Sequence, residues 1–240
     1  MAKRNYLLEK ITNIFTDIPR GKVLDLGCGD GDYAIILKKL GFEVIACDVD
    51  EQRFKYKTEI EFKKCDLTQR LTFGDNSFDY VLLLEVIEHL NNPYSFMQEL
   101  KRILKDNGTL ILSTPNILSL KSRMRFLFEG AFEYFREPPL DQMHNPKEKI
   151  FNLHIFLYRF HELEYLLWRN GFIIDKIFTS NYDGFEYSLF LPAISLQLFL
   201  KSRRSKKKHG IGHSRINKIL LSKELLFGRH LIIKAMKAML

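Results

Sequence analysis

Short apolar runs rich in Val, Ile and Leu alternate along the chain with segments in which apolar residues recur every three or four positions. The first pattern is typical of buried strands and the second of amphipathic helices. The predicted strands are 22–26, 42–47, 60–65, 78–84, 109–113, 172–178 and 230–234, and the predicted helices are 32–40, 94–104 and 160–170. Strands that alternate with helices in this way predict an α/β fold with a parallel sheet and helices on both faces.

The composition fits one globular domain that spans residues 1–240. The chain is 46% hydrophobic and 28% charged, which excludes a disordered or collagen-like protein. The net charge of +8 is unevenly distributed along the sequence, because the residues from Lys201 onward include 12 Lys and Arg but only one acid, Glu224. The first 200 residues therefore carry a net charge of −3. This asymmetry predicts an anionic partner for the cationic end.

The cysteines and the N-terminus predict a cytoplasmic protein. Cys28, Cys47 and Cys65 form neither a CxxC pair nor a secreted disulfide framework, so a reducing compartment fits best. Residues 1–18 lack the apolar core of a signal peptide. The most apolar stretch, 189–200, is shorter than the roughly 20 residues of a membrane-spanning helix.

A glycine-rich turn follows the first predicted strand. Glycine occupies every second position, at Gly27, Gly29 and Gly31, which permits positive φ angles and lets a ligand lie against the backbone. A dinucleotide-binding fingerprint would need glycine where Asp32 stands, and no Gly-Lys-Ser/Thr of a Walker loop follows. The turn therefore predicts a ligand that lies against the backbone, without the fingerprint of either of these two classes.

This turn resembles the first motif of class I S-adenosylmethionine (SAM)-dependent methyltransferases, of the kind called types 11 and 23. The similar motifs continue in order through Asp48, Asp66, residues 78–90 and residues 104–110, so the resemblance covers about residues 20–178, and a further strand near 227–234. It implies a three-layer, doubly wound Rossmann-like sheet of order 3-2-1-4-5-7-6 with the last strand antiparallel.

The resemblance implies SAM as the cofactor and assigns its contacts. The residues that it places around the cofactor are Asp25, Gly27, Cys28, Gly29, Asp30, Gly31, Asp48, Asp66, Leu67 and Glu85. Asp48 would accept from the ribose hydroxyls, Asp66 would accept from the adenine amino group, and Glu85 would lie near the methionine end. The alternative is that Asp48 and Asp66 only form turns at strand ends, a common use of aspartate.

His89, with Glu88 beside it, is the predicted catalytic residue. Its ordinary pKa of about 6.5 suits a general base for a hydroxyl acceptor. If the segment is helical, Glu85, Glu88 and His89 share one face. The pattern is similar to a divalent-metal site of ubiquinone-pathway O-methyltransferases and small-RNA terminal 2′-O-methyltransferases, in which His154 would be the later ligand. We favour His89 acting without metal, and leave a divalent ion as the less favoured alternative.

Residues 117–152 are predicted to form a lid over the open face of the sheet and to supply the acceptor pocket. Aromatic side chains stand there beside Arg123, Arg125 and Arg136, a mixture that suits an acceptor with an apolar body and an anionic group. The alternative is a small apolar lid core from which the arginines reach out to water.

Residues 188–224 are predicted to be an insertion before the last strand. An apolar stretch there precedes six basic residues between Lys201 and Lys208, the composition of an anchor at an anionic membrane. The alternative is a core helix followed by a solvated loop. A membrane anchor would make the protein peripheral at the membrane and would suit a lipid-linked acceptor.

The predicted activity is SAM-dependent O-methylation of a small-molecule or lipid- or glycan-linked acceptor. An RNA methyltransferase of the metal-assisted 2′-O type is an alternative, but the basic run lacks the aromatic residues that stack on bases. A non-catalytic binding module with the same fold is a further alternative. It would require a damaged cofactor motif, and the motifs are intact.

Overall fold

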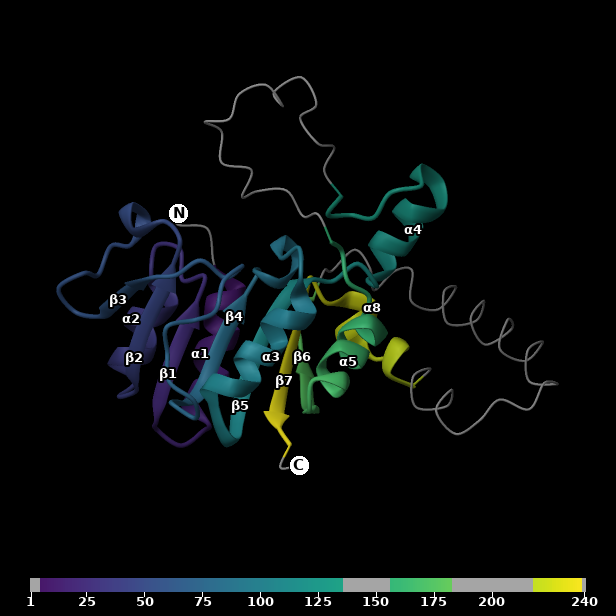
Figure 1. Ribbon diagram of the computed structural model, residues 1–240. Coiled ribbons are helices and arrows are strands. Elements are labelled where there is room, and N and C mark those ends of the chain that lie inside the picture. The colour runs from purple at the N-terminus through teal and green to yellow at the C-terminus, as the bar shows by residue number, and fades with distance from the viewer. Residues whose placement is uncertain (1–4, 136–155, 183–217, 239–240) are drawn as a thin grey trace, which may run out of the picture.

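The computed structural model describes residues 5–135, 156–182 and 218–238 (Figure 1). Its centre is a seven-stranded sheet of order β3-β2-β1-β4-β5-β7-β6. The strands are β1 (Lys22–Leu26), β2 (Glu43–Asp48), β3 (Glu61–Lys64), β4 (Phe78–Leu84), β5 (Leu104–Pro115), β6 (Phe172–Phe178) and β7 (His230–Lys237). β7 is antiparallel to both of its neighbours, and the other pairings are parallel. The predicted order and the antiparallel last strand are confirmed.

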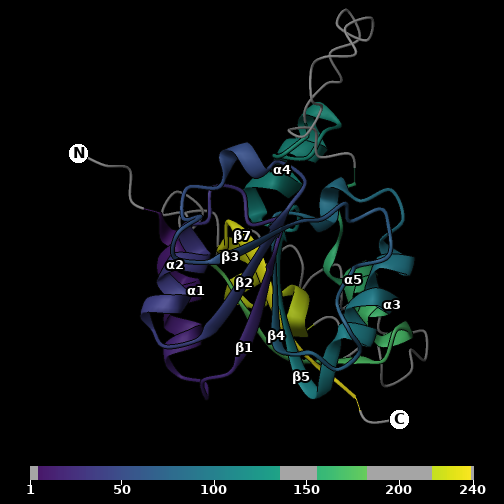
Figure 2. The same ribbon diagram turned by 60° about the vertical axis from the view of Figure 1, so that its left-hand side comes forward.

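Helices cover both faces of the sheet, which gives the predicted three layers. The α-helices are α1 (Tyr6–Thr16), α2 (Asp32–Lys39), α3 (Pro93–Ile103), α4 (Leu120–Glu129), α5 (Phe160–Arg169) and α8 (Lys223–Phe227), and two short 3₁₀ helices are η1 (Glu51–Arg53) and η2 (Ile87–His89). Figure 2 shows α1 and α2 on one side of the sheet and α3 and α5 on the other. Each side has its own buried apolar cluster.

The sequence pattern did not predict α1. Its buried residues are Leu7, Ile11, Ile14 and Phe15, which lie on one side of the helix. The ring of Phe15 is fully buried and makes edge contacts with the rings of Phe42 and Tyr80, at centroid distances of 5.2 and 5.8 Å. The helix α1 therefore covers part of the apolar cluster on one face of the sheet.

The carboxyl ends of the parallel strands meet at one edge of the sheet, and α4 stands above this edge (Figures 1 and 2). The described helix of the predicted lid region, α4, therefore lies above the strand ends and not over a face of the sheet, and the role of this region as a lid stays a prediction. Residues 136–152 of the lid lie outside the described part of the chain. The carboxyl edge is where the predicted cofactor residues gather.

The segment between β6 and β7 is long, as predicted, and ends with α8. Its apolar stretch and its basic run from Lys201 to Lys208 fall outside the described residues. Close to the sheet, Tyr182 forms an isolated antiparallel bridge with Gly228, which joins the two ends of the segment. Among the described residues, no helix is long and apolar enough to cross a membrane.

The sulfur atoms of Cys47 and Cys65 lie in contact with each other, and the two Cα atoms are 5.8 Å apart. The spacing of the cysteines in the sequence did not indicate this pair. The two residues come together because β2 and β3 are parallel neighbours, and each cysteine stands directly before an aspartate, Asp48 or Asp66. Cys28 remains a buried free thiol.

Candidate active site

The glycine turn after β1 has a backbone that only glycine adopts easily. Gly27, Gly29 and Gly31 have φ angles of 72°, 55° and 88°. A Cβ atom on Gly27 would lie 2.5 Å from Cγ2 of Val86, so the turn also leaves no room there for a side chain. The N–H groups of Gly27 and Cys28 donate to the carbonyl of Cys47, at 2.8 and 3.1 Å. These bonds tie the turn to the end of β2.

Asp48 completes this connection between the two strands. One carboxylate oxygen of Asp48 accepts from the Gly29 N–H at 2.8 Å, and the other accepts from the Asp50 N–H at 2.9 Å. A carboxylate has about four lone-pair sites, so these two bonds leave capacity for hydroxyl donors. Asp30, which the resemblance also placed at the cofactor, is paired with Lys55 at 2.7 Å.

Asp66 forms a turn just after β3. It accepts from the N–H and the hydroxyl of Thr68, at 2.9 and 2.7 Å, and these hydrogen bonds hold the pKa of its carboxyl below the ordinary value. Asp48 and Asp66 therefore both accept hydrogen bonds within turns, and these bonds leave lone pairs open to a ligand, so their role at the cofactor stays a prediction. Leu67 follows, half-buried against the core.

Asp25 is a buried acid in the strand that leads into the glycine turn. Its side chain is 2% exposed, and its Oδ2 atom has no hydrogen-bond partner within the described residues. Burial, reinforced by the negative charge of Asp48, raises the pKa of Asp25 to about 7. A buried carboxyl without a partner costs free energy that a cationic ligand would recover.

Glu85 ends β4 in a left-handed conformation with φ of 52°. Its N–H donates to the Ser113 carbonyl at 3.1 Å, and its Oε1 accepts from the Ser113 hydroxyl at 2.7 Å. Burial raises the pKa of Glu85 to about 7, partly opposed by the Ser113 hydrogen bond and the charge of Arg229. The side chain is thereby fixed at the carboxyl edge between β4 and β5.

Glu88 is completely buried, and its Oε2 accepts from the hydroxyl of Thr114 at 3.1 Å. Burial, together with the nearby Glu85, raises the pKa of Glu88 to about 8. The predicted helical face of Glu85, Glu88 and His89 does not form. Glu85 precedes a single 3₁₀ turn, Ile87–His89, so the i, i+3, i+4 spacing of an α-helix does not apply.

His89 is half-buried at the end of η2, where its N–H donates to the Val86 carbonyl at 2.9 Å. Within the ranges that the structure describes, no group of three or more His, Cys, Asp or Glu side chains is placed to hold a metal ion. His154, the predicted later ligand, lies outside those ranges. The complete metal set stays a prediction.

His230 was not identified from the sequence, and it lies at the same edge. It opens β7 opposite Pro115 at the end of β5. The Ser180 hydroxyl donates to Asn181 Oδ1 at 2.9 Å and lies 2.6 Å from His230 Nδ1, so the serine oxygen accepts from Nδ1–H. The Nε2 atom of His230 is then an acceptor, 4.0 Å from Glu85 Oε2.

The imidazole of His230 is neutral at neutral pH, because burial, aided by the charge of Arg229, lowers its pKa to about 4. One signal in the sequence could have identified it. The first residues of an antiparallel strand lie at the edge where parallel strands end, and His230 opens the last predicted strand.

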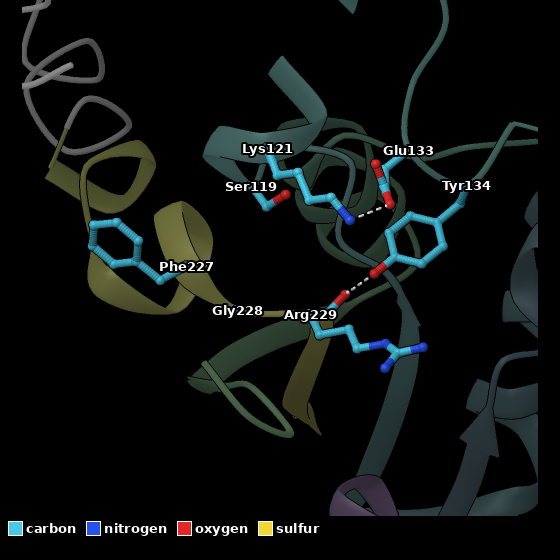
Figure 3. Close-up of a pocket in the computed structure, with 7 residues that line it drawn as sticks. All are labelled: Ser119, Lys121, Glu133, Tyr134, Phe227, Gly228 and Arg229. Carbon is cyan, nitrogen blue, oxygen red and sulfur yellow. Dashed lines mark hydrogen bonds and ion pairs between the residues drawn. The ribbon is translucent and has the colours of Figure 1, made fainter. Parts of the chain in front are cut away.

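A cavity of about 170 Å³ lies between α4 and the turn that precedes β7 (Figure 3). It is lined by Ser119, Lys121, Glu133, Tyr134, Phe227, Gly228 and Arg229. Lys121 is paired with Glu133 at 2.6 Å, and the Tyr134 hydroxyl donates to the Arg229 carbonyl at 3.0 Å.

The arginines that the sequence suggested for an acceptor have structural partners. Arg123 donates to the carbonyls of Leu118 and Leu220 at 2.7 and 3.1 Å. Arg125 pairs with Glu129 at 2.7 Å and donates to a backbone carbonyl. Arg136 lies outside the described residues. Arg229, which belongs to none of the sequence motifs, is the arginine that lines the cavity.

Curated relatives share part of this chain. The ubiquinone biosynthesis O-methyltransferase of Rickettsia bellii is 37% identical over 118 residues, which cover 47% of this chain and 49% of that protein. The protein of the same name from Rickettsia typhi is 33% identical over 129 residues, 51% of each chain. The chain thus spans about half the length of the curated relatives it matches.

Solved structures share the fold over nearly the whole chain. A SAM-dependent methyltransferase from Archaeoglobus fulgidus has a TM-score of 0.58 at 20% identity and covers 96% of this chain and 91% of its own. A Thermotoga maritima protein described as a SAM-dependent methyltransferase, possible histamine N-methyltransferase, has a TM-score of 0.57 at 19% identity, with 97% and 89% covered. At these identities the likeness shows the fold alone.

The family comparison covers the site itself. A family model described as a methyltransferase domain matches residues 2–177, which include the glycine turn, the acids after β2 and β3, and the segment after β4. Since this match spans well over half of the sequence, the chain belongs to the methyltransferase-domain family.

Proposed function

We propose that this protein transfers a methyl group from SAM to an oxygen atom of a small-molecule or lipid-linked acceptor. The observation that carries the proposal is the buried Asp25 carboxyl, whose Oδ2 atom has no partner among the described residues, beside a turn whose three glycines have positive φ. The first feature suits a cation and the second suits a ligand that lies against backbone. SAM combines a cationic end with a nucleoside.

The residues at the carboxyl edge fit this cofactor. When bound, SAM supplies a methyl group on a positively charged sulfur, so the protein chiefly has to align the acceptor with it. The turn from Gly27 to Gly31 would lie against the cofactor, and the free lone pairs of Asp48 and Asp66 would accept from ribose hydroxyls and from the adenine amino group. Asp25 and Glu85 would compensate the positive charge at the methionine end.

Two histidines are candidates to receive the proton of an acceptor hydroxyl. His89 follows β4, as the sequence analysis proposed, and His230 enters from β7 with an acceptor nitrogen directed toward Glu85. Glu88 is fully buried and bonded to Thr114, which favours a supporting role over direct contact with the acceptor. A neutral imidazole at this edge is able to accept a hydrogen bond from a hydroxyl group.

The proposal is tested by measuring SAM affinity by calorimetry. Asp48→Ala should weaken SAM binding by about 1–3 kcal/mol, the scale for losing charge-assisted hydrogen bonds. Asp17→Ala is the control, since Asp17 follows α1 near the opposite edge of the sheet. Equal affinity of the two variants would remove Asp48 from the site, and no SAM binding by the wild type would overturn the proposed function.

The acceptor itself is best found with labelled SAM. Incubating fractionated metabolite and lipid extracts with the protein and deuterium-methyl SAM should yield a product heavier by one labelled methyl group. Parallel reactions with EDTA test the divalent-metal alternative, because full activity after metal removal would exclude it. Label transfer to RNA alone would favour the alternative RNA methyltransferase.

The proposed location is the cytoplasm, with attachment to anionic membranes, and the charge distribution supports this proposal. Residues from Lys201 onward are strongly cationic whereas the preceding chain is mildly acidic. Each basic residue near an anionic leaflet contributes about 1 kcal/mol. In a flotation assay with anionic liposomes, the wild type should float with the liposomes and a Lys206/Lys207/Lys208→Glu variant should not. Equal flotation of variant and wild type would contradict the electrostatic attachment.

A further inference from the structure

The turn that precedes β7 holds the backbone of Arg229 in place from three directions. The N–H of Arg229 donates to the Asn181 carbonyl at 3.2 Å. The carbonyl of Arg229 accepts from the Asn116 N–H at 3.2 Å and from the Tyr134 hydroxyl at 3.0 Å. The preceding Gly228 is tightly packed, because a Cβ atom there would overlap the Glu224 carbonyl oxygen. The side chain therefore starts from a fixed point.

The side chain of Arg229 is exposed, and within the described ranges its charge has no direct ion pair. No carboxylate in the described ranges forms an ion pair with it, whereas the other cation of the cavity, Lys121, is neutralised by Glu133. Figure 3 shows the Arg229 side chain extending away from that pair, past the ring of Tyr134. A pre-positioned guanidinium with free donors is a strong binding group for carboxylate or phosphate oxygens.

The charge of Arg229 also acts on the candidate active site. It contributes to the electrostatic environment of Glu85 at the end of β4, of His230 at the start of β7 and of Tyr134 in the cavity wall. Arg229 therefore lines the cavity and lies within electrostatic range of the residues near which methyl transfer is proposed. A group bound there would belong to a molecule that reaches the same edge of the sheet.

The size of the cavity indicates what it holds. At about 170 Å³ it is smaller than the roughly 300–1,000 Å³ of pockets that enclose a whole ligand. We propose that the cavity is a subsite for an anionic oxygen group, a carboxylate or a phosphate, on the methyl acceptor, and that Arg229 binds this group. The inference rests on the proposed function only in naming the ligand as the acceptor.

Direct binding of small anions tests the subsite. The probes are 4-fluorobenzoate, 4-fluorophenyl phosphate and the neutral 4-fluorobenzyl alcohol, observed by ¹⁹F NMR with wild-type protein. At least one anion should bind more tightly than the alcohol, and the better of the two distinguishes a carboxylate from a phosphate. Arg229→Met should weaken that anion about 10- to 100-fold, the scale for losing hydrogen bonds to a charged group.

Two further variants keep the result interpretable. Arg229→Lys retains the charge but loses the two-pronged geometry, so an intermediate affinity is expected. Arg169→Met, on the exposed end of α5, removes the same charge elsewhere and should leave anion binding unchanged. Equal anion binding by wild type and Arg229→Met, no preference for an anion over the alcohol, or an equal loss in Arg169→Met would each overturn the subsite.

SAM calorimetry on the same variants separates this inference from the proposed function. Arg229→Met should bind SAM like the wild type. A loss of SAM affinity in Arg229→Met would assign the guanidinium to the cofactor and overturn the acceptor subsite. If the wild type fails to bind SAM but still binds the anion through Arg229, the proposed function alone would be overturned.

Discussion

Gly27→Ala is the sharpest perturbation of the cofactor turn, because its cost has two separable parts. The backbone at Gly27 has a φ of 72°, and a side chain in this left-handed conformation costs about 1–2 kcal/mol. The added Cβ would also lie 2.5 Å from Val86 Cγ2, and overpacking of this kind costs about 1–3 kcal/mol. The free energy of unfolding should therefore fall by about 2–5 kcal/mol.

Gly130→Ala is the matched control for the backbone part. Gly130 ends α4 with a φ of 74°, and an added Cβ would have nothing within 4 Å. Its cost should be the conformational part alone, about 1–2 kcal/mol. Urea denaturation followed by circular dichroism measures both variants, and the difference between them isolates the contact with Val86.

Val86→Ala completes the cycle. Alone it should cost about 1–2 kcal/mol for the lost buried carbons, but combined with Gly27→Ala it removes the overlap. The double variant should therefore be about 1–3 kcal/mol more stable than the sum of the single changes predicts. Additive costs, or equal costs of Gly27→Ala and Gly130→Ala, would refute the packing of the turn against the segment after β4.

Further predictions concern one ion-pair hub and one buried acid. Arg102 forms ion pairs with Glu99 and Asp75, so Arg102→Met should lower the free energy of unfolding by about 1.5–3 kcal/mol. The control Lys57→Met, which removes an exposed ion pair, should lower it by less than about 1 kcal/mol. Equal urea midpoints of the two variants would contradict this prediction. Because the pKa of Asp25 is raised from 3.8 to about 7, its stabilising contribution is complete below pH 4 and is lost as the pH rises through 7. Asp25→Asn should flatten that loss in thermal melts, and an unchanged pH profile would contradict it.

The central strands were predictable because their signal is local. A strand buried on both faces of a parallel sheet reads as a continuous apolar run, and β1 and β4 have the bounds predicted from such runs. The bounds of the edge strand β6 were also predicted correctly, from its β-branched and aromatic residues. β5 was predicted five residues too late at its start. There the backbone pairs with β4 through a register shift at Phe78/Tyr80, and the polar residues before Gly108 resemble a turn.

The helix α1 and the acceptor side of the site were less accessible to sequence reasoning. The stripe of Leu7, Ile11, Ile14 and Phe15 is interrupted by charged positions, and its partners on β2 and β4 become neighbours only in the assembled sheet. Arg229 and His230 stand more than 100 residues from the motif residues that they approach. No local periodicity predicts such a juxtaposition, which depends on β7 running antiparallel to β5.

The buried acids and the arginine near the carboxyl edge of the sheet would together couple the binding of cofactor and acceptor. Asp25 and Glu85 are buried acids whose pKa values are raised to about 7, so a cationic ligand beside them would favour their ionised forms. Arg229 offers the opposite charge within electrostatic range of Glu85. A cationic cofactor and an anionic acceptor would attract each other across this edge, and linkage requires each to raise the affinity of the other by the same factor. The transfer of the methyl group removes the cofactor's sulfonium charge, and this mutual attraction should then weaken, which favours release of the products.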